Sequence, residues 1–167
     1  MKRHDADAAL IAAFETSASD LLAYLARRAP ADDAPDLLGE TMVVAWRRVK
    51  ELPEDPERAR MWLFGIARGT LQNHVRGQRR RWALVDRIRG TAAVTTAPPA
   101  DAGSEVRDAI DRLDPDLSEL VRLVHWEWLS LADAAELLGI PASTARSRYQ
   151  RAKDQLRAAL SLEVPLA

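Results

Sequence analysis

The chain has 167 residues, of which 47% are hydrophobic and 29% charged, and its formal net charge is -1 at pH 7. This composition excludes a chain that is disordered throughout and is typical of a soluble helical protein. The absence of cysteine excludes disulfides and thiolate zinc sites, and it allows a reducing compartment. Asp5, Asp7 and Glu15 interrupt the N-terminal segment, and no apolar run approaches the roughly 18 residues of a membrane span. We therefore expect a cytoplasmic protein without membrane insertion.

The first half of the chain predicts three helices. Apolar side chains recur at helical spacing up to Leu25, and Pro30 and Pro35 then interrupt the chain. A second helix opens at Asp36 and ends before Pro53, and a third starts near Glu57. The expected apolar positions are Leu10, Phe14, Ala18, Leu21, Leu22 and Leu25 in the first helix, Leu37, Leu38, Thr41, Val44, Ala45 and Val49 in the second, and Trp62, Leu63, Ile66, Ala67, Leu71 and Val75 in the third.

The composition changes between residues 90 and 104, where small and polar residues surround a double proline and no apolar period remains. We interpret this segment as a flexible linker. Beyond it a helical pattern resumes at Val106, Ile110, Leu113, Leu117, Leu120, Val121, Val124 and Trp128. No strand pattern of useful length occurs. The sequence therefore predicts an all-α fold of two small helical domains, residues 1–89 and 105–167.

The basic residues are concentrated in two stretches, although the net charge of the chain is close to zero. Residues 66–89 hold 7 Arg against one Asp, and residues 142–160 hold 4 Arg and one Lys against one Asp. Two compact basic stretches in a chain of nearly balanced charge predict two separate sites for a polyanion.

The segment from Leu129 to Leu160 has the pattern of a helix-turn-helix. Leu131, Ala134, Ala135 and Leu138 form a short helix, Gly139 can adopt the left-handed conformation that ends it, and Ile140 fills the turn before Pro141. This arrangement is typical of proteins that place their second helix in the DNA major groove.

In that second helix, Ala145, Tyr149, Ala152 and Leu156 share one face and are expected in the core. Arginine can bridge a guanine edge or hold phosphate, glutamine can bond adenine, and serine allows close backbone approach. A solvated charged surface is the alternative, but the turn, the glycine and the basic face together favour DNA. The candidate DNA contacts are Ser143, Thr144, Arg146, Ser147, Arg148, Gln150 and Arg151.

Three segments, taken in order, resemble two regions of bacterial RNA polymerase sigma factors of the extracytoplasmic-function group. DLLGETMVVAWRRV and MWLFGIARGTLQNHVRGQRRR resemble sigma region 2, and VRDAIDRLDPDLSELVRLVHWEWLSLADAAELLGIPASTARSRYQRAKDQL resembles region 4. With the linker between them, these segments span nearly the whole chain. The resemblance implies a transcription initiation factor that directs core polymerase to promoters and assists DNA melting.

The resemblance places a docking helix for the clamp coiled coil of core polymerase at Asp36, Leu37, Glu40, Thr41 and Trp46. Asp36 and Glu40 lie one turn apart and suit partner arginines, while a tryptophan can anchor an interface. The alternatives are a helix cap for Asp36 and a core position for Trp46. For Trp46 we favour the core.

The resemblance also implies that the third helix meets and melts the minus-ten element through Arg68, Asn73, Arg76, Arg79 and Arg80. Such a surface binds separated strands and so offsets the cost of unpairing. We expect Trp62 to pack in the core and Trp82 to be exposed.

The sequence departs from the family pattern at three places. Gly69 replaces a common Asn, Gly39 replaces a common Gln, and the loop KELPEDPERARM lacks the aromatic that in relatives helps to hold a flipped base.

Other functions remain to be weighed. His4, His74 and His125 are scattered and no catalytic motif is present, so we expect no enzyme, no cofactor and no metal. A helix-turn-helix regulator that never engages polymerase would explain only the second half. A family member that recruits polymerase without melting DNA is a third possibility. The expected partners are core polymerase, through its clamp and flap, double- and single-stranded promoter DNA, and an anti-sigma factor.

Overall fold

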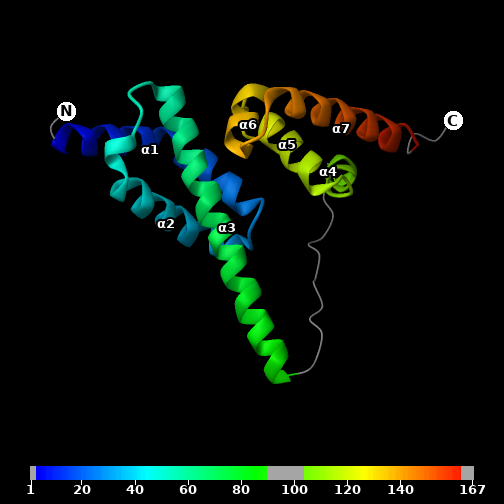
Figure 1. Ribbon diagram of the computed structural model, residues 1–167, viewed down its shortest axis with the longest axis horizontal. Coiled ribbons are helices and arrows are strands. Elements are labelled where there is room, and N and C mark those ends of the chain that lie inside the picture. Colours follow the sequence, from blue (N-terminus) through cyan, green and yellow to red (C-terminus); the bar gives the residue numbers. More distant parts are fainter. Residues whose placement is uncertain (1–2, 90–103, 163–167) are drawn as a thin grey trace. The chain divides into compact units, whose positions relative to one another are not determined.

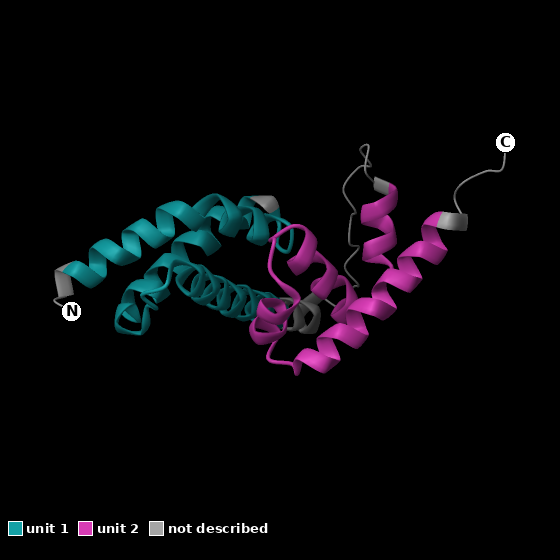
Figure 2. Ribbon diagram, turned by 90° about the horizontal axis from the view of Figure 1, so that it is seen from above, with its two compact units in different colours: residues 1–94 teal, residues 95–167 magenta. Residues whose placement is uncertain are grey.

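The computed structural model describes residues 3–89 and 104–162, and every regular element in these ranges is helical (Figure 1). The chain divides into two compact units, residues 1–94 and 95–167 (Figure 2). The elements of the first unit are α1 (Arg3–Ala26), the short 3-10 helix η1 (Ala31–Asp33), α2 (Ala34–Arg47), η2 (Val49–Glu51) and α3 (Pro56–Arg89). Those of the second are α4 (Ser104–Asp111), α5 (Pro115–His125), α6 (Leu131–Leu138) and α7 (Ala142–Leu162). The prediction of an all-α fold is confirmed, while the domain boundaries stay predictions because residues 90–103 lie outside the described ranges.

In the first unit, α1, α2 and α3 pack against one another in all three pairs. Their shared core includes Leu10, Leu25, Leu37 and Leu63, all buried. Buried Thr41 donates its hydroxyl to the Leu37 carbonyl at 2.7 Å, which satisfies a polar group that would otherwise oppose burial. The other core positions include Phe14, Leu21, Tyr24, Ala45, Phe64, Ile66, Ala67 and Leu71, with the Tyr24 and Phe64 rings edge to face at 5.5 Å.

Helix α1 is apolar over a longer stretch than its interrupting acidic residues indicate. Asp5–Ala26 is long and apolar enough to cross a membrane, with a mean hydropathy of 1.3 over its best window. A third of that window, 33%, is nevertheless buried inside the unit, where Leu10, Leu21 and Leu25 face α2 and α3. The core helix of a soluble protein has this composition for the same reason, so the packing accounts for it.

Helix α3 begins where the sequence predicts. Pro56 occupies its first turn, and the Asp55 carboxylate accepts the Arg58 backbone N–H at 2.9 Å, which satisfies one of the unpaired donors of a helix start. The buried stripe continues through Leu71 but not to Val75, which is 36% exposed. Figure 1 shows that the second half of α3 extends past α1 and α2, and near Val75 the helix is held on one side, where His74 and Gln78 meet Asp33. The expectation of a buried Val75 is therefore wrong.

In the second unit, Ile110, Leu113, Leu117, Val121 and Ala152 form a buried cluster. Trp126, Tyr149 and Leu156 pack against it from the side. Two positions of the predicted apolar pattern differ, because Val106 and Trp128 are exposed. For Trp128 the cause is the backbone, which leaves the helix after His125 and turns before α6, so that helical spacing no longer applies.

The predicted helix-turn-helix is formed by α6 and α7. Ser130 caps α6 by accepting the Asp133 N–H at 3.1 Å. Gly139 ends it with φ 67°, and the Ile140 N–H donates to the Ala135 carbonyl at 3.0 Å, as in a Schellman turn. Small side chains at the contact, among them Ala134, Ala135 and Ala145, are buried and bring α6 and α7 close together.

We predict that Gly139→Ala lowers the free energy of unfolding by about 1 kcal/mol. A Cβ at this position would meet no atom within 4 Å, so the loss comes from the left-handed backbone alone. Urea unfolding followed by circular dichroism measures it. Gly139→Asn is the matched control and should lose less, because asparagine tolerates this conformation. Equal losses for the two variants would contradict the explanation.

Candidate DNA-binding and docking surfaces

The exposed face of α7 carries most of the predicted DNA contacts. Ala145 and Ala152 are fully buried on the opposite face, against the rest of the unit. This one-sided packing leaves an open strip of polar and basic side chains along the helix that follows the turn. Exposed on it are Ser143, Arg146, Ser147, Gln150 and Arg151, while Thr144 is half-buried.

Several of these side chains are already oriented by neighbours. Gln150 Nε2 donates to Asp154 at 3.0 Å. Arg151 Nη2 lies 3.6 Å from the Asp114 carboxylate, and both of these side chains are about two-thirds exposed, at 67% and 66%. An ion pair this exposed contributes little to stability, so DNA phosphate can replace Asp114 at small cost.

Arg148 is placed differently from the rest. It is half-buried on the flank of α7, and its guanidinium pairs with Asp116 of α5 at 2.9 Å. To reach DNA, Arg148 would have to give up this pair. The sequence predicts Arg148 as a DNA contact like Arg146 and Arg151, because spacing along a helix does not reveal which side chains meet an acidic residue on another helix.

The second basic surface follows α3 beyond the core. Asn73, Arg76, Arg79 and Arg80 are exposed, and Arg68, nearer the core, is half-buried. Arg76 donates to the Asn73 side-chain carbonyl at 2.7 Å, which leaves the amide hydrogens of Asn73 pointing to other partners. The side chain of Trp82 lies outside the described residues.

A polar cluster fastens this part of α3 to the start of α2. Asp33 Oδ2 lies 3.1 Å from His74 Nε2 and 3.2 Å from Gln78 Nε2, and these two nitrogens are 2.8 Å apart. His74 thus makes a structural contact between α3 and the start of α2. The cluster itself could not be predicted, because Asp33 is remote in sequence.

Helix α2 offers a partly apolar surface. Asp36 and Glu40 are exposed. Leu37 and Thr41 lie in the core, so they hold α2 against the rest of the unit and are not themselves on the surface. The preference for a core position of Trp46 is wrong, because this side chain is 40% exposed. Val43 is 50% exposed beside it. Together with Gly39, Met42 and Arg47, these two residues line a shallow hollow of about 390 Å³.

The end of α2 is braced by a local ion pair. Arg48 donates to the Glu51 carboxylate from Nε, at 3.1 Å to each oxygen, and from Nη2, at 2.5 Å. These bonds lower the pKa of Glu51 and raise that of Arg48. The Arg48 guanidinium also lies 6.0 Å above the ring of half-buried Trp62. Trp62 thus closes one side of the unit rather than filling its centre.

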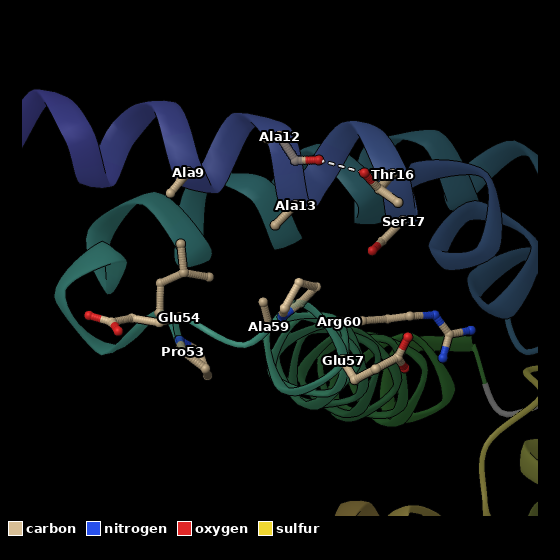
Figure 3. A pocket seen from close by; sticks show the side chains of 12 residues that line it. Ala9, Ala12, Ala13, Thr16, Ser17, Pro53, Glu54, Glu57, Ala59 and Arg60 are labelled. Carbon is tan, nitrogen blue, oxygen red and sulfur yellow. Dashed lines mark hydrogen bonds between the residues drawn. The ribbon is translucent and has the colours of Figure 1, made fainter.

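The loop between η2 and α3 borders a pocket of about 490 Å³. Figure 3 shows small side chains of α1, among them Ala13, on one wall and Glu54 and Glu57 at the other. Arg60 also lines it, and at 3.6 residues per turn Arg60 and Arg76 lie on nearly opposite sides of α3. The pocket therefore opens away from the basic surface, and its carboxylates would repel phosphate. We do not assign it to DNA.

Trp128 is an exposed residue whose position the helical pattern does not predict. It is 82% exposed, and its φ of 56° is the only positive value of a non-glycine residue among those described. This conformation costs an ordinary residue about 1–2 kcal/mol. The signal that could have revealed it is the short connection between His125 and the Ser130 cap, which leaves little chain for the turn.

Among the described residues, no group of three His, Asp or Glu side chains could hold a metal ion.

Comparisons with known proteins agree with both halves of this description. The family model for Sigma-70 region 2 matches residues 13–81, and that for Sigma-70, region 4, matches residues 104–156. The region 2 match accounts for the half of the chain that a simple helix-turn-helix regulator leaves unexplained.

Single relatives show the same similarity. The ECF RNA polymerase sigma factor SigC of Mycobacterium tuberculosis is 32% identical over 155 residues, which cover 90% of this chain and 82% of that protein. The sigma factor RpoE, solved in complex with the anti-sigma factor NepR from Bartonella quintana, has a similar fold, with a TM-score of 0.64, 24% identity, and coverage of 96% of this chain and 99% of that one. CnrH, solved with the cytosolic domain of CnrY, gives a TM-score of 0.65 at 22% identity, covering 97% and 96%.

These matches, together with two helical units and a DNA-binding helix-turn-helix in the second, identify the chain as a member of the ECF group of the sigma-70 family, a non-enzymatic factor of transcription initiation.

Proposed function

We propose that this sigma factor reads both elements of its promoters, the minus-ten element with α3 and the minus-thirty-five element with α7, and assists DNA melting. The observation that carries the proposal is the exposed face of α7, which presents Arg146, Gln150 and Arg151 from the second helix of a helix-turn-helix. In this motif the second helix enters the major groove, where such side chains meet base edges.

On α7 the roles divide by position. Gln150 and Arg151 lie beyond the first turn of the helix and can contact base edges, while Ser143 and Ser147 allow the backbone to come close. Arg146 is exposed one turn nearer the start of α7 than Gln150 and suits phosphate or a guanine edge. Thr144 and Arg148, being half-buried, take a smaller part.

On α3, melting requires more favourable contacts with open strands than with the duplex. Arg76, Arg79 and Arg80 can hold phosphates, and Asn73 can bond an exposed base edge. Arg68 lies closer to the core and would meet the same strand nearer the body of the unit. No covalent step is needed, because binding energy to the separated strands offsets the cost of unpairing.

On α2, the docking surface for the clamp coiled coil of core polymerase combines charge and apolar area. Asp36 and Glu40 can pair with partner arginines, and Trp46 with Val43 supplies the apolar area that interfaces use as an anchor. Leu37 and Thr41 support this surface from the core. The second unit would contact the polymerase flap, as the family resemblance implies.

We further propose that the protein acts in the cytoplasm, where polymerase is found, and is held inactive by an anti-sigma factor. The support for the latter is that RpoE, a structural relative, was solved in complex with the anti-sigma factor NepR.

Run-off transcription with purified core polymerase and the promoter upstream of the protein's own operon tests the function as a whole. We expect specific transcripts only when the protein is added. Binding to that promoter DNA without binding to core polymerase would overturn the proposal, and binding to both without open-complex formation would remove the melting role.

We predict that Trp46→Ala weakens binding to core polymerase by about 1–2 kcal/mol, because it removes the apolar anchor of α2. Affinity measured with labelled core polymerase gives the value. Leu22→Ala is the control, since Leu22 is similarly exposed, at 37%, but lies on α1. If both variants bind as tightly as the wild type, α2 is not the docking helix.

We predict that Arg151→Ala weakens binding to the cognate minus-thirty-five duplex by about 1–3 kcal/mol and relaxes specificity at one base pair. Fluorescence anisotropy with the cognate duplex and its point variants measures both effects. Arg157→Ala is the control, because Arg157 is exposed further along α7 and pairs with Asp154. An equal loss on every duplex would show that Arg151 holds phosphate instead of reading a base.

A further inference from the structure

Trp128 combines two unfavourable properties. Its indole is 82% exposed, and its backbone has φ 56°, a value that glycine adopts without strain. The buried cluster of this unit is complete without it, since Trp126 is the tryptophan that packs there. Folding therefore gains nothing from this side chain, and a bound partner is the natural explanation for it.

The segment that carries Trp128 is held firmly on both sides. His125 Nε2 lies 2.8 Å from the Tyr149 hydroxyl, and their rings are stacked at 6.0 Å. Glu127 is buried, and the Leu129 N–H donates to the Leu123 carbonyl at 3.1 Å. The indole is thus presented from a fixed backbone, so binding it loses little conformational entropy.

The surroundings of Trp128 argue against a protein partner. Protein interfaces place a tryptophan in the centre of an apolar patch. Among the described residues of this unit, the other large exposed apolar side chain is Val106, which lies on α4, and α4 packs on α5 and α7. The residues after Trp128 that reach the surface are small or polar, among them Ser130 and Ala132. A single indole in polar surroundings suits a polar partner.

The position of Trp128 indicates which partner this is. Trp128 precedes the Ser130 cap of α6, the first helix of the helix-turn-helix. When the second helix of such a motif enters the major groove, the first crosses the DNA backbone. With α7 in the groove, this docking geometry would bring the start of α6 beside the DNA backbone.

We propose that Trp128 packs its indole against the sugar-phosphate backbone of duplex DNA, beside the groove that α7 enters. The indole face covers the sugar edge, and its N–H can donate to a phosphate oxygen. A backbone contact carries no sequence information, so it adds affinity and fixes the register of α7 without choosing bases. This inference rests on the proposed binding of the duplex by α7.

The test uses the full-length protein carrying 5-fluorotryptophan, with the resonance of Trp128 assigned by its loss in Trp128→Phe. We expect this resonance to move when a short duplex of arbitrary sequence is added at low salt, and the resonance of Trp62 to stay. In anisotropy assays, Trp128→Gly and Trp128→Ala should both raise the dissociation constant about threefold to tenfold, equally on cognate and unrelated duplexes. Trp128→Gly should also raise the Tm, because it relieves the backbone.

Two controls separate the possible outcomes. Val106→Ala removes an exposed apolar side chain on α4 and should leave DNA binding unchanged. If both Trp128 variants bind as the wild type while Arg151→Ala does not, the inference falls and the proposed role of α7 stands. If Arg151→Ala also binds normally, α7 itself is not the reading helix. A Trp128 resonance that moves only with core polymerase would overturn the DNA contact in favour of a protein contact.

Discussion

The buried stripe on one side of each basic helix is the constraint on which both binding surfaces depend. Along α3 this stripe runs from Leu63 to Leu71, and along α7 it includes Ala145 and Ala152. Burial removes apolar area from water and fixes the rotation of each helix about its axis, since turning it would expose that area. The opposite side is then presented to solvent without any further interaction to hold it there. The proposed DNA contacts on α3 and α7 inherit their direction from this one-sided packing.

The near-neutral net charge of the chain is compatible with nucleic-acid binding, because several acidic side chains lie beside the basic helices and orient their side chains. Asp114 and Asp116 stand at the start of α5 beside the arginines of α7, and Asp33 holds His74 and Gln78 of α3. The ion pair of Arg151 with Asp114 is exposed and weak, so DNA phosphate can displace the aspartate. The side chain of Arg148, which pairs with Asp116, is less exposed. A phosphate can therefore replace Asp114 as the partner of Arg151 while Arg148 stays paired with Asp116 of α5.

Exposed tryptophans mark surfaces that folding does not explain. Trp46 lies on α2 and Trp128 in the turn between α5 and α6, and neither fills a core. An aromatic side chain left in water loses a large favourable burial energy, which binding can recover. The two differ in their neighbours: Trp46 has Val43 and Met42 beside it, as a protein interface requires, whereas Trp128 stands alone.

Much of this protein could be read from the order of its residues alone, because the relevant signals are local. Helical spacing, Pro56, the Ser130 cap and Gly139 each act within a few residues, so the all-α fold, the helix-turn-helix and the face of α7 were predictable. The tertiary structure alone decided the rest. Trp46 and Val75 are exposed because no other helix covers those sides of α2 and α3, and Arg148 is diverted by an aspartate on a different helix. Trp128 turns outward because the chain must bend between α5 and α6. Whether a side chain is covered depends on segments remote in sequence, and no local pattern encodes that.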